Sequence, residues 1–164
     1  MNNYYPLAPQ NEWHYKQNGG DTYINKIVAA NDNEFTMHNS AFNKNSIVRS
    51  DGNLFTTDAL EAGNFQQWLK NDLQQGDRWS ISFKANGLDC IMIMTVKEKD
   101  IEKSVEGKNF TNVILIEAES KMMMNSNIVS LNFFTQYYYA DGIGLILTTS
   151  SAGDKHALID YQLN

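Results

Sequence analysis

The chain has 164 residues, of which 42% are hydrophobic and 12% aromatic, and its formal net charge is −6. This length suits a single core, and the apolar content excludes wholesale disorder. The acidic balance argues against non-specific binding to nucleic acid, which requires a positively charged face.

No apolar run reaches the roughly 18 residues that a membrane-spanning helix needs, and the first residues lack the basic and apolar regions of a signal peptide. The single cysteine, Cys90, excludes an intrachain disulfide framework and a multi-cysteine metal site. Its apolar neighbours predict a small buried side chain rather than a reactive thiolate. Two interpretations of the location remain: a cytoplasmic protein, or a secreted domain in its mature form.

Apolar and polar residues alternate along most of the chain, which is the pattern of strands that bury one face. Segments 34–38, 79–85, 129–139 and 156–163 show it most clearly. Residues that tolerate positive φ separate these segments, and the pair Asn86 and Gly87 predicts a tight two-residue hairpin. Such short connections predict a meander of about nine to eleven antiparallel strands.

One segment has a different periodicity. Apolar residues recur there at the spacing of a helical face: Phe65, Trp68, Leu69 and Leu73. With Asn64 as N-cap and Gly76 as the stop, this spacing predicts one helix near residues 64–74, packed on the sheet. We therefore predict a mostly β fold, a single domain over residues 1–164 whose antiparallel meander forms a curved sheet, half-barrel or open barrel.

Few residues carry obvious chemistry. His14, His38 and His156 lie on the polar sides of predicted strands, where we expect solvated side chains, although the sequence leaves open that they converge. Glu117 and Glu119 share a strand face, which suits acid–base chemistry, a calcium site or simply an exposed face. No nucleotide-binding loop, metalloprotease motif or serine-hydrolase motif occurs. We expect no catalytic residue, no metal and no cofactor.

Three consecutive methionines at 122–124 and three tyrosines at 137–139 are candidates for binding an apolar molecule, because methionine adapts to varied apolar surfaces. In alternating strands, Met122 and Met124 would share a face, as would Tyr137 and Tyr139. We therefore take these four residues as candidate lining of an apolar groove. Ordinary packing in the core is the competing interpretation.

Several short motifs occur in one order along the chain: YYPL at 4–7, NEWHY at 11–15, GDRW at 76–79, GKNFTNV at 107–113 and YYADGIGLI at 138–146. Together they resemble a family of uncharacterised bacterial envelope proteins, secreted or of lipoprotein type. The resemblance implies a mostly β domain on the periplasmic or extracellular side, although Gln10 stands where the family commonly has glycine and the leader and lipidated cysteine are absent from this chain.

The matched positions have architectural rather than catalytic character. Trp13 and Trp79 are expected to cover the end of the core, and Tyr15 is a structural residue of the opening motif. Gly142 is expected to supply a positive φ, and Gly144 to let an aromatic ring lie against the backbone. The leading functional hypothesis is a non-enzymatic envelope module that binds a partner protein or an apolar ligand. The alternative is an acidic inhibitor or immunity-type protein that masks a basic toxin surface, for which only charge and size argue.

Overall fold

The structure, a computed structural model, describes all residues from 1 to 164 and contains twelve strands and no helix. The strands are β1 (Glu12–Gln17), β2 (Thr22–Asn31), β3 (Glu34–Asn39), β4 (Lys44–Ser50), β5 (Leu54–Thr57), β6 (Gln66–Lys70), β7 (Arg78–Ala85), β8 (Leu88–Val105), β9 (Lys108–Met124), β10 (Asn127–Ala140), β11 (Gly144–Ser150) and β12 (Lys155–Gln162). The predicted mostly β, antiparallel meander is confirmed, with more strands than expected.

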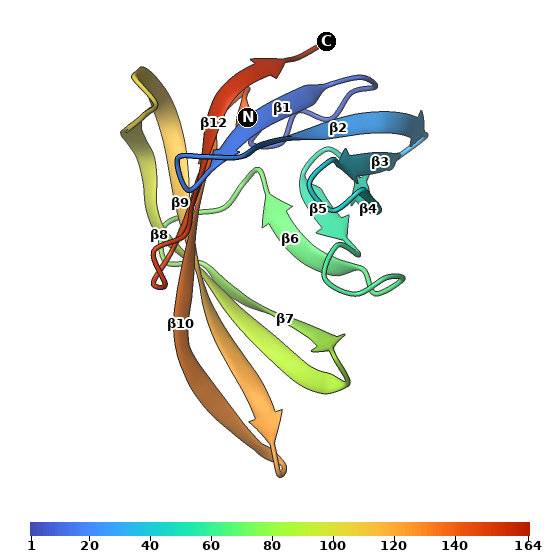
Figure 1. Cartoon of the computed structure of the whole chain (residues 1–164), viewed down its shortest axis with the longest axis vertical. Coiled ribbons are helices and arrows are strands. Elements are labelled where there is room, and N and C mark those ends of the chain that lie inside the picture. The colour runs from blue at the N-terminus through green and yellow to red at the C-terminus, as the bar shows by residue number, and fades with distance from the viewer.

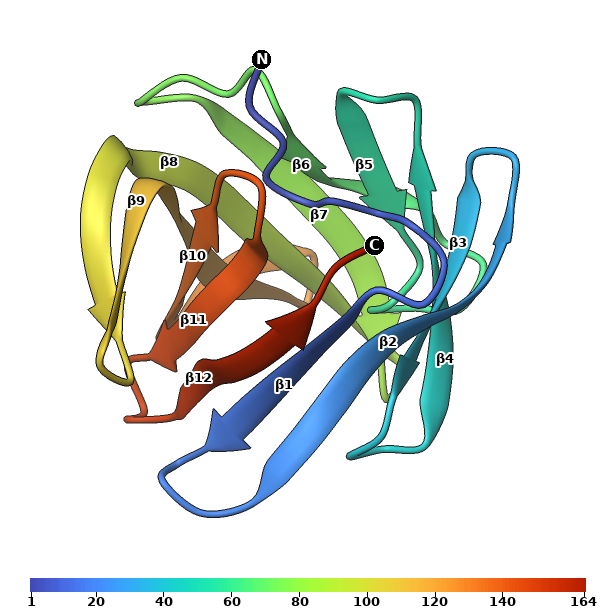
Figure 2. The same cartoon turned by 90° about the horizontal axis from the view of Figure 1, so that it is seen from above.

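All twelve strands form one sheet, in the order β6-β5-β4-β3-β2-β1-β12-β11-β10-β9-β8-β7. Strands that follow one another in sequence are neighbours everywhere except between β6 and β7, and β1 pairs with β12. The sheet curls until its two end strands, β6 and β7, face each other, so that it forms a nearly closed barrel (Figure 1). Viewed from above, the strands are arranged in a ring (Figure 2).

The hairpin between β7 and β8 shows how turn chemistry sets the register. Asn86 and Gly87 have φ of 53° and 77°, and Ala85 pairs directly with Leu88. Two consecutive positive φ values give a turn whose twist matches that of the strands. The predicted two-residue hairpin is therefore confirmed.

The segment that precedes β1 crosses one end of the barrel (Figure 2). The Tyr4 N–H donates to Asn71 Oδ1 at 2.9 Å, and the Gly142 N–H donates to the Asn3 carbonyl at 2.8 Å. Tyr4 is fully buried, and Tyr5 packs beside it against the core. The opening motif at 4–7 thus closes this end of the barrel.

The predicted helix near residues 64–74 is wrong, because this segment forms β6 and the turns around it. A β-bulge explains the misleading periodicity: Leu69 pairs with Phe55 and Gln67 with Thr56, so that Trp68 is an extra residue in the ladder. A bulge lets two consecutive side chains reach the same side of a sheet. The adjacent Trp68 and Leu69 therefore imitate the i+3, i+4 spacing of a helix.

Candidate functional site

An apolar pocket of about 530 Å³ opens inside the barrel between β2, β3, β4, β5 and β6. Ten of its fifteen lining residues are hydrophobic: Tyr5, Met37, Phe42, Val48, Phe55, Ala59, Leu60, Trp68, Tyr139 and Leu145. The other five are Asn25, Asn39, Lys44, Ser46 and Thr57. This volume lies within the range of small-molecule sites, about 300–1,000 Å³, and the apolar lining with a few polar groups is typical of them.

Aromatic rings form the base of the pocket. Tyr5 lies against Phe55 and Tyr139, with ring centroids 5.7 Å and 6.2 Å away. The Trp68 indole N–H donates to the Tyr139 hydroxyl at 2.6 Å. Burial raises the pKa of both Tyr5 and Tyr139 well above the ordinary value of 10, so both phenols stay neutral at physiological pH.

Two loops frame the mouth, one between β3 and β4 and the other between β5 and β6. Each contributes an exposed apolar side chain: Phe42 is 80% exposed and Leu60 is 37% exposed. Exposing large apolar side chains to water is unfavourable, and an apolar molecule that enters the pocket would cover them. The mouth is thus apolar on two sides.

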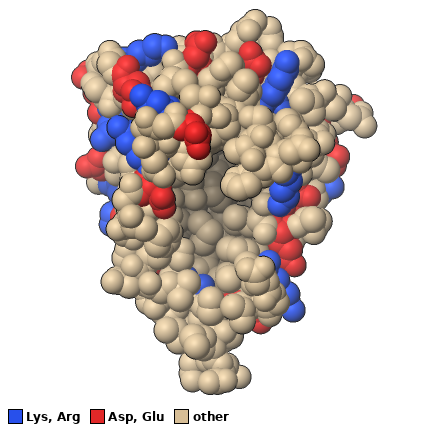
Figure 3. Space-filling model, viewed as in Figure 1, with Lys and Arg blue, Asp and Glu red and all other residues tan.

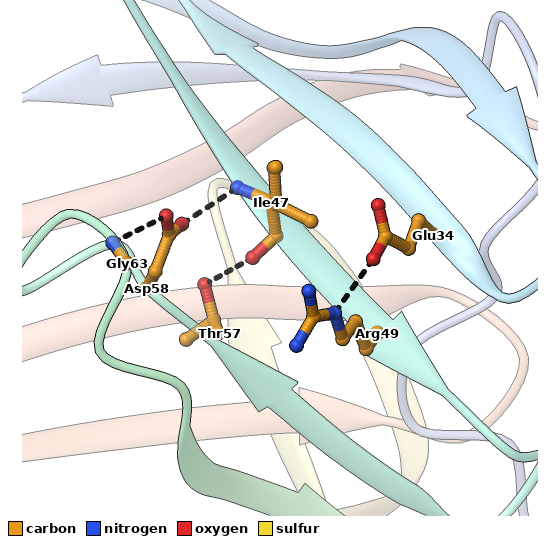
Figure 4. Close-up of polar contacts among 6 residues, drawn as sticks. All are labelled: Glu34, Ile47, Arg49, Thr57, Asp58 and Gly63. Atoms are coloured by element: carbon orange, nitrogen blue, oxygen red, sulfur yellow. Dashed lines mark hydrogen bonds and ion pairs between the residues drawn. The ribbon is translucent and has the colours of Figure 1, made fainter.

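The β5–β6 loop is held firmly to β4. Asp58 accepts hydrogen bonds from the backbone N–H groups of Ile47 and Gly63, at 2.9 Å and 3.0 Å (Figure 4). The Thr57 hydroxyl donates to the Ile47 carbonyl at 2.9 Å, and nearby Arg49 pairs with Glu34 at 2.7 Å (Figure 4). The hydrogen bonds of Thr57 and Asp58 fix the loop that carries Leu60, so this side of the mouth is pre-formed.

Side chains, rather than a backbone ladder, bridge the seam between β6 and β7. Glu61 Oε1 accepts from the Lys84 backbone N–H at 3.0 Å, and Asn64 Nδ2 donates to the Ser82 carbonyl at 2.9 Å. The Trp79 indole N–H donates to the Gln67 carbonyl at 3.1 Å. The bond from Lys84 and a further one from Asn64 lower the pKa of Glu61. The open edge of β7 is thereby covered, which guards it against pairing with another chain.

The four residues predicted to line an apolar groove occupy different parts of one sheet face. Tyr139 lines the pocket, and the Tyr137 ring packs edge-on against Trp68 with centroids 5.2 Å apart. Met122 and Met124 follow on the same face of β9, but Met122 lies six residues beyond Ile116, the partner of Tyr137. Six strand residues span about 20 Å. The structure therefore brings the two tyrosines together and leaves the methionines at a distance.

The methionines belong to the projecting tip of the β9–β10 hairpin. Four apolar side chains are exposed there, Met124, Ile128, Val129 and Leu131, each by 40–57%. The sequence from 122 to 135 has no charged residue, and the lower end of the molecule carries no charge colour in the space-filling view (Figure 3). This tip is a second apolar surface, separate from the pocket.

Four of the five predicted architectural residues lie together, on β1 and around the turn between β10 and β11. The Trp13 indole N–H donates to the Ile143 carbonyl at 2.7 Å, and the Tyr15 hydroxyl donates to the Leu145 carbonyl at 2.7 Å. Gly142 and Gly144 have φ of 77° and 113°. A Cβ on Gly144 would lie 3.0 Å from Trp13 Nε1, so the indole rests directly against this backbone. Trp79 bridges the seam, as described above.

The three histidines lie on separate strands. His14 is 3.4 Å from Glu12, His38 bonds Asn45 at 2.7 Å, and His156 bonds the Tyr23 hydroxyl at 2.6 Å. No group of three or more His, Cys, Asp or Glu side chains is arranged to hold a metal ion.

The other residues singled out for their chemistry, two glutamates and a cysteine, each have ordinary surroundings. Glu117 accepts a hydrogen bond from Gln136 at 3.0 Å and Glu119 one from Ser130 at 3.1 Å, on the polar side of β9. Cys90 is a half-buried free thiol.

Sequence reasoning missed the polar part of the pocket. Asn25, Asn39, Lys44 and Ser46 occupy inward positions of β2, β3 and β4 and were not singled out. The available signal was the pairing pattern: Lys44 pairs with Asn39 and Ser46 with Met37 across one ladder. The polar part of the pocket could have been predicted only if the register between β3 and β4 had been known.

No family model matches this chain, and no curated protein matches it significantly. No helix is long and apolar enough to cross a membrane. Among solved structures, the chain is similar to a protein of Bacteroides fragilis with a YmcC-like fold, provisionally described as exported, over 99% of this chain and 100% of that one, with a TM-score of 0.58 and 9% identity.

A protein from Parabacteroides distasonis, provisionally described as a lipoprotein, matches with a TM-score of 0.50 and 10% identity over 98% of this chain and 99% of its own. The hypothetical lipoprotein YmcC of Escherichia coli aligns over 94% of this chain and 86% of its own, with a TM-score of 0.46 and 9% identity. At such low identities the likeness concerns the fold alone. The chain has a YmcC-like fold.

Proposed function

We propose that this protein is a non-enzymatic binding module of the bacterial cell envelope that holds an apolar molecule inside its barrel. The observation that carries the proposal is the pre-formed pocket of about 530 Å³, two thirds of whose lining residues are hydrophobic. Burying apolar area of a ligand there is worth about 25 cal/mol per Å² before the costs of binding. The envelope location is supported by the fold that the chain shares with proteins described as exported or as lipoproteins.

The chemistry of the lining favours binding over reaction. His, Cys, Asp and Glu do not occur among the fifteen lining residues. The two phenols at the base have raised pKa values because they are buried, which makes them poor bases and poor nucleophiles near neutral pH. What the pocket offers is apolar surface and hydrogen bonds.

The experiment fills the pocket and leaves the rest of the barrel unchanged. Ser46 is half-buried and faces inward from the middle of β4, and its hydroxyl makes no hydrogen bond, so Ser46→Phe places a ring in the cavity. Asn45→Phe is the matched control, because Asn45 is the adjacent residue on the opposite, exposed face of the same strand. Circular dichroism verifies that both variants fold.

The probe is nile red, a neutral dye whose emission rises and shifts to the blue in apolar surroundings. We expect the native protein and Asn45→Phe to bind it equally, and Ser46→Phe to bind it at least tenfold more weakly. Equal binding by all three proteins, or binding by none, would refute the proposal.

A further inference from the structure

The pocket is amphipathic along its depth. Its base consists of apolar residues such as Val48, Phe55 and Leu145, whereas its polar residues are half-buried or exposed and lie nearer the mouth, between the apolar side chains of Phe42 and Leu60. The inward-facing residues of β4 become less polar with depth, from Lys44 at the mouth through Ser46 to the buried Val48. We call the set Asn25, Asn39, Lys44, Ser46 and Thr57 the polar collar.

Apart from the Ser46 hydroxyl, the side-chain acceptor atoms of the polar collar are engaged within the protein. Asn39 Oδ1 accepts from the N–H groups of Ala41 and Phe42, at 2.9 Å and 3.1 Å. Asn25 Oδ1 accepts from Asn39 Nδ2 at 2.9 Å. Thr57 Oγ1 accepts from the Ala59 N–H at 3.2 Å and donates to the Ile47 carbonyl. These bonds fix the orientation of both amides.

The uncommitted groups of the polar collar are mainly donors, since only the Ser46 hydroxyl among them can also accept. The Asn25 amide N–H₂ and the Ser46 hydroxyl have no partner within the protein, and Lys44 has no carboxylate within 4.0 Å of its ammonium group. Lys44 is also the single charged residue of the lining. The two carboxylates of the neighbouring loop, Asp58 and Glu61, are held by backbone N–H groups instead.

A donor-rich collar with one cation above an apolar base is complementary to one kind of molecule. We propose that the pocket takes a single-chain amphiphile with an anionic oxygen headgroup, its tail at the aromatic base and its headgroup at Lys44, Asn25 and Ser46. This inference rests on the proposed function and specifies its ligand. The chain as a whole carries a net charge of −6, so it does not attract anions in general. An unpaired lysine at the mouth therefore favours specific recognition of an anionic group at this place.

Three probes with the same twelve-carbon tail separate the headgroup from the tail: dodecanoate, dodecyl phosphate and dodecanol. Binding is measured by displacement of nile red below the critical micelle concentration. We expect both anions to bind more tightly than dodecanol, and the stronger of the two identifies a carboxylate or a phosphate headgroup. Because a half-exposed charge pair is worth at most about a fivefold change, Lys44→Gln should weaken anion binding by about that factor and leave dodecanol unchanged.

Lys99→Gln is the matched control, since it changes the net charge equally and lies on β8, outside the pocket. It should leave all three affinities unchanged. If dodecanol binds as tightly as the anions and Lys44→Gln alters nothing, the headgroup inference is refuted while nile red binding still supports the apolar pocket. If nile red itself does not bind, the proposed function fails and this inference fails with it.

Discussion

The contact between Gly144 and Trp13 yields the sharpest test of how the architecture supports the pocket. Gly144 has a φ of 113°, and an added Cβ would approach Trp13 Nε1 to 3.0 Å and Cε2 to 3.4 Å. Gly144→Ala therefore combines an unfavourable backbone conformation, about 1–3 kcal/mol, with displacement of the indole. If the ring moves, its hydrogen bond to the Ile143 carbonyl is weakened, at about 1 kcal/mol.

The sum predicts a loss of about 2–4 kcal/mol in the free energy of unfolding. Gly142→Ala is the matched control, because Gly142 also has a positive φ, 77°, but nothing lies within 4 Å of its added Cβ. It should cost only the backbone term of about 1–2 kcal/mol. Urea denaturation followed by tryptophan fluorescence measures both, and the Gly144 variant should unfold at a midpoint about 1 M lower than the control.

This displacement should reach the proposed ligand pocket. Trp13 packs on Tyr5 with ring centroids 5.9 Å apart, and Tyr5 lines the base of the pocket. We therefore expect Gly144→Ala to weaken nile red binding, and Gly142→Ala to leave it unchanged. Identical urea midpoints for the two variants would show that the approach of Trp13 to this backbone has no energetic role.

Three further predictions concern the seam and two titrating groups. Glu61→Ala removes the acceptor that covers the Lys84 N–H, so we expect the variant to self-associate through the edge of β7. Light scattering should show a mass that grows with protein concentration, and a constant monomer mass would contradict this role of Glu61. Burial raises the pKa of Tyr137 to about 12, so between pH 10 and 12 this group alone should lower the free energy of unfolding by about 1.4 kcal/mol per unit, in addition to the other buried tyrosines. Tyr137→Phe should reduce the slope by that amount in urea titrations, and an unchanged slope would contradict it. Burial, opposed by Asp154, lowers the pKa of His156 below 6.5, so the folded state prefers the neutral ring. The contribution of this group to stability is therefore complete above pH 6.5 and declines below it. His156→Gln should make the melting temperature less dependent on pH below 6.5, and a curve parallel to that of the native protein would exclude this group.

Local patterns in the sequence were sufficient to predict the most regular strands and the sharpest turn. Alternation in 79–85 and the two positive-φ residues Asn86 and Gly87 act within a few residues of one another, and the structure follows them. The helix prediction failed because Trp68 is a bulge residue, and a bulge depends on the partner strand β5. No local pattern in 64–74 carries that information.

The pocket was hidden for a related reason. In β4 the residues Lys44, Ser46 and Val48 face inward, while Asn45, Ile47 and Arg49 face outward. Each set contains one apolar residue, so alternation alone does not decide which face is inside. The register with β3 and β5 decides it, and that register depends on the closure of the whole sheet.

The same polar inward faces that obscure the pocket in the sequence are the physical reason that it exists. The half of the barrel built from β7, β8 and β9 fills its interior with large apolar side chains, such as Ile81, Met94 and Ile116, all of them buried. The half built from β2, β3 and β4 places Asn25, Asn39 and Ser46 at the corresponding inward positions. Such side chains are shorter or more strongly hydrated than isoleucine or methionine and do not close a core to the density of a protein interior. The β7–β9 side of the barrel therefore closes its interior with apolar side chains, whereas the β2–β4 side, which also contributes buried residues such as Ile27, Met37 and Val48, leaves a pre-formed cavity.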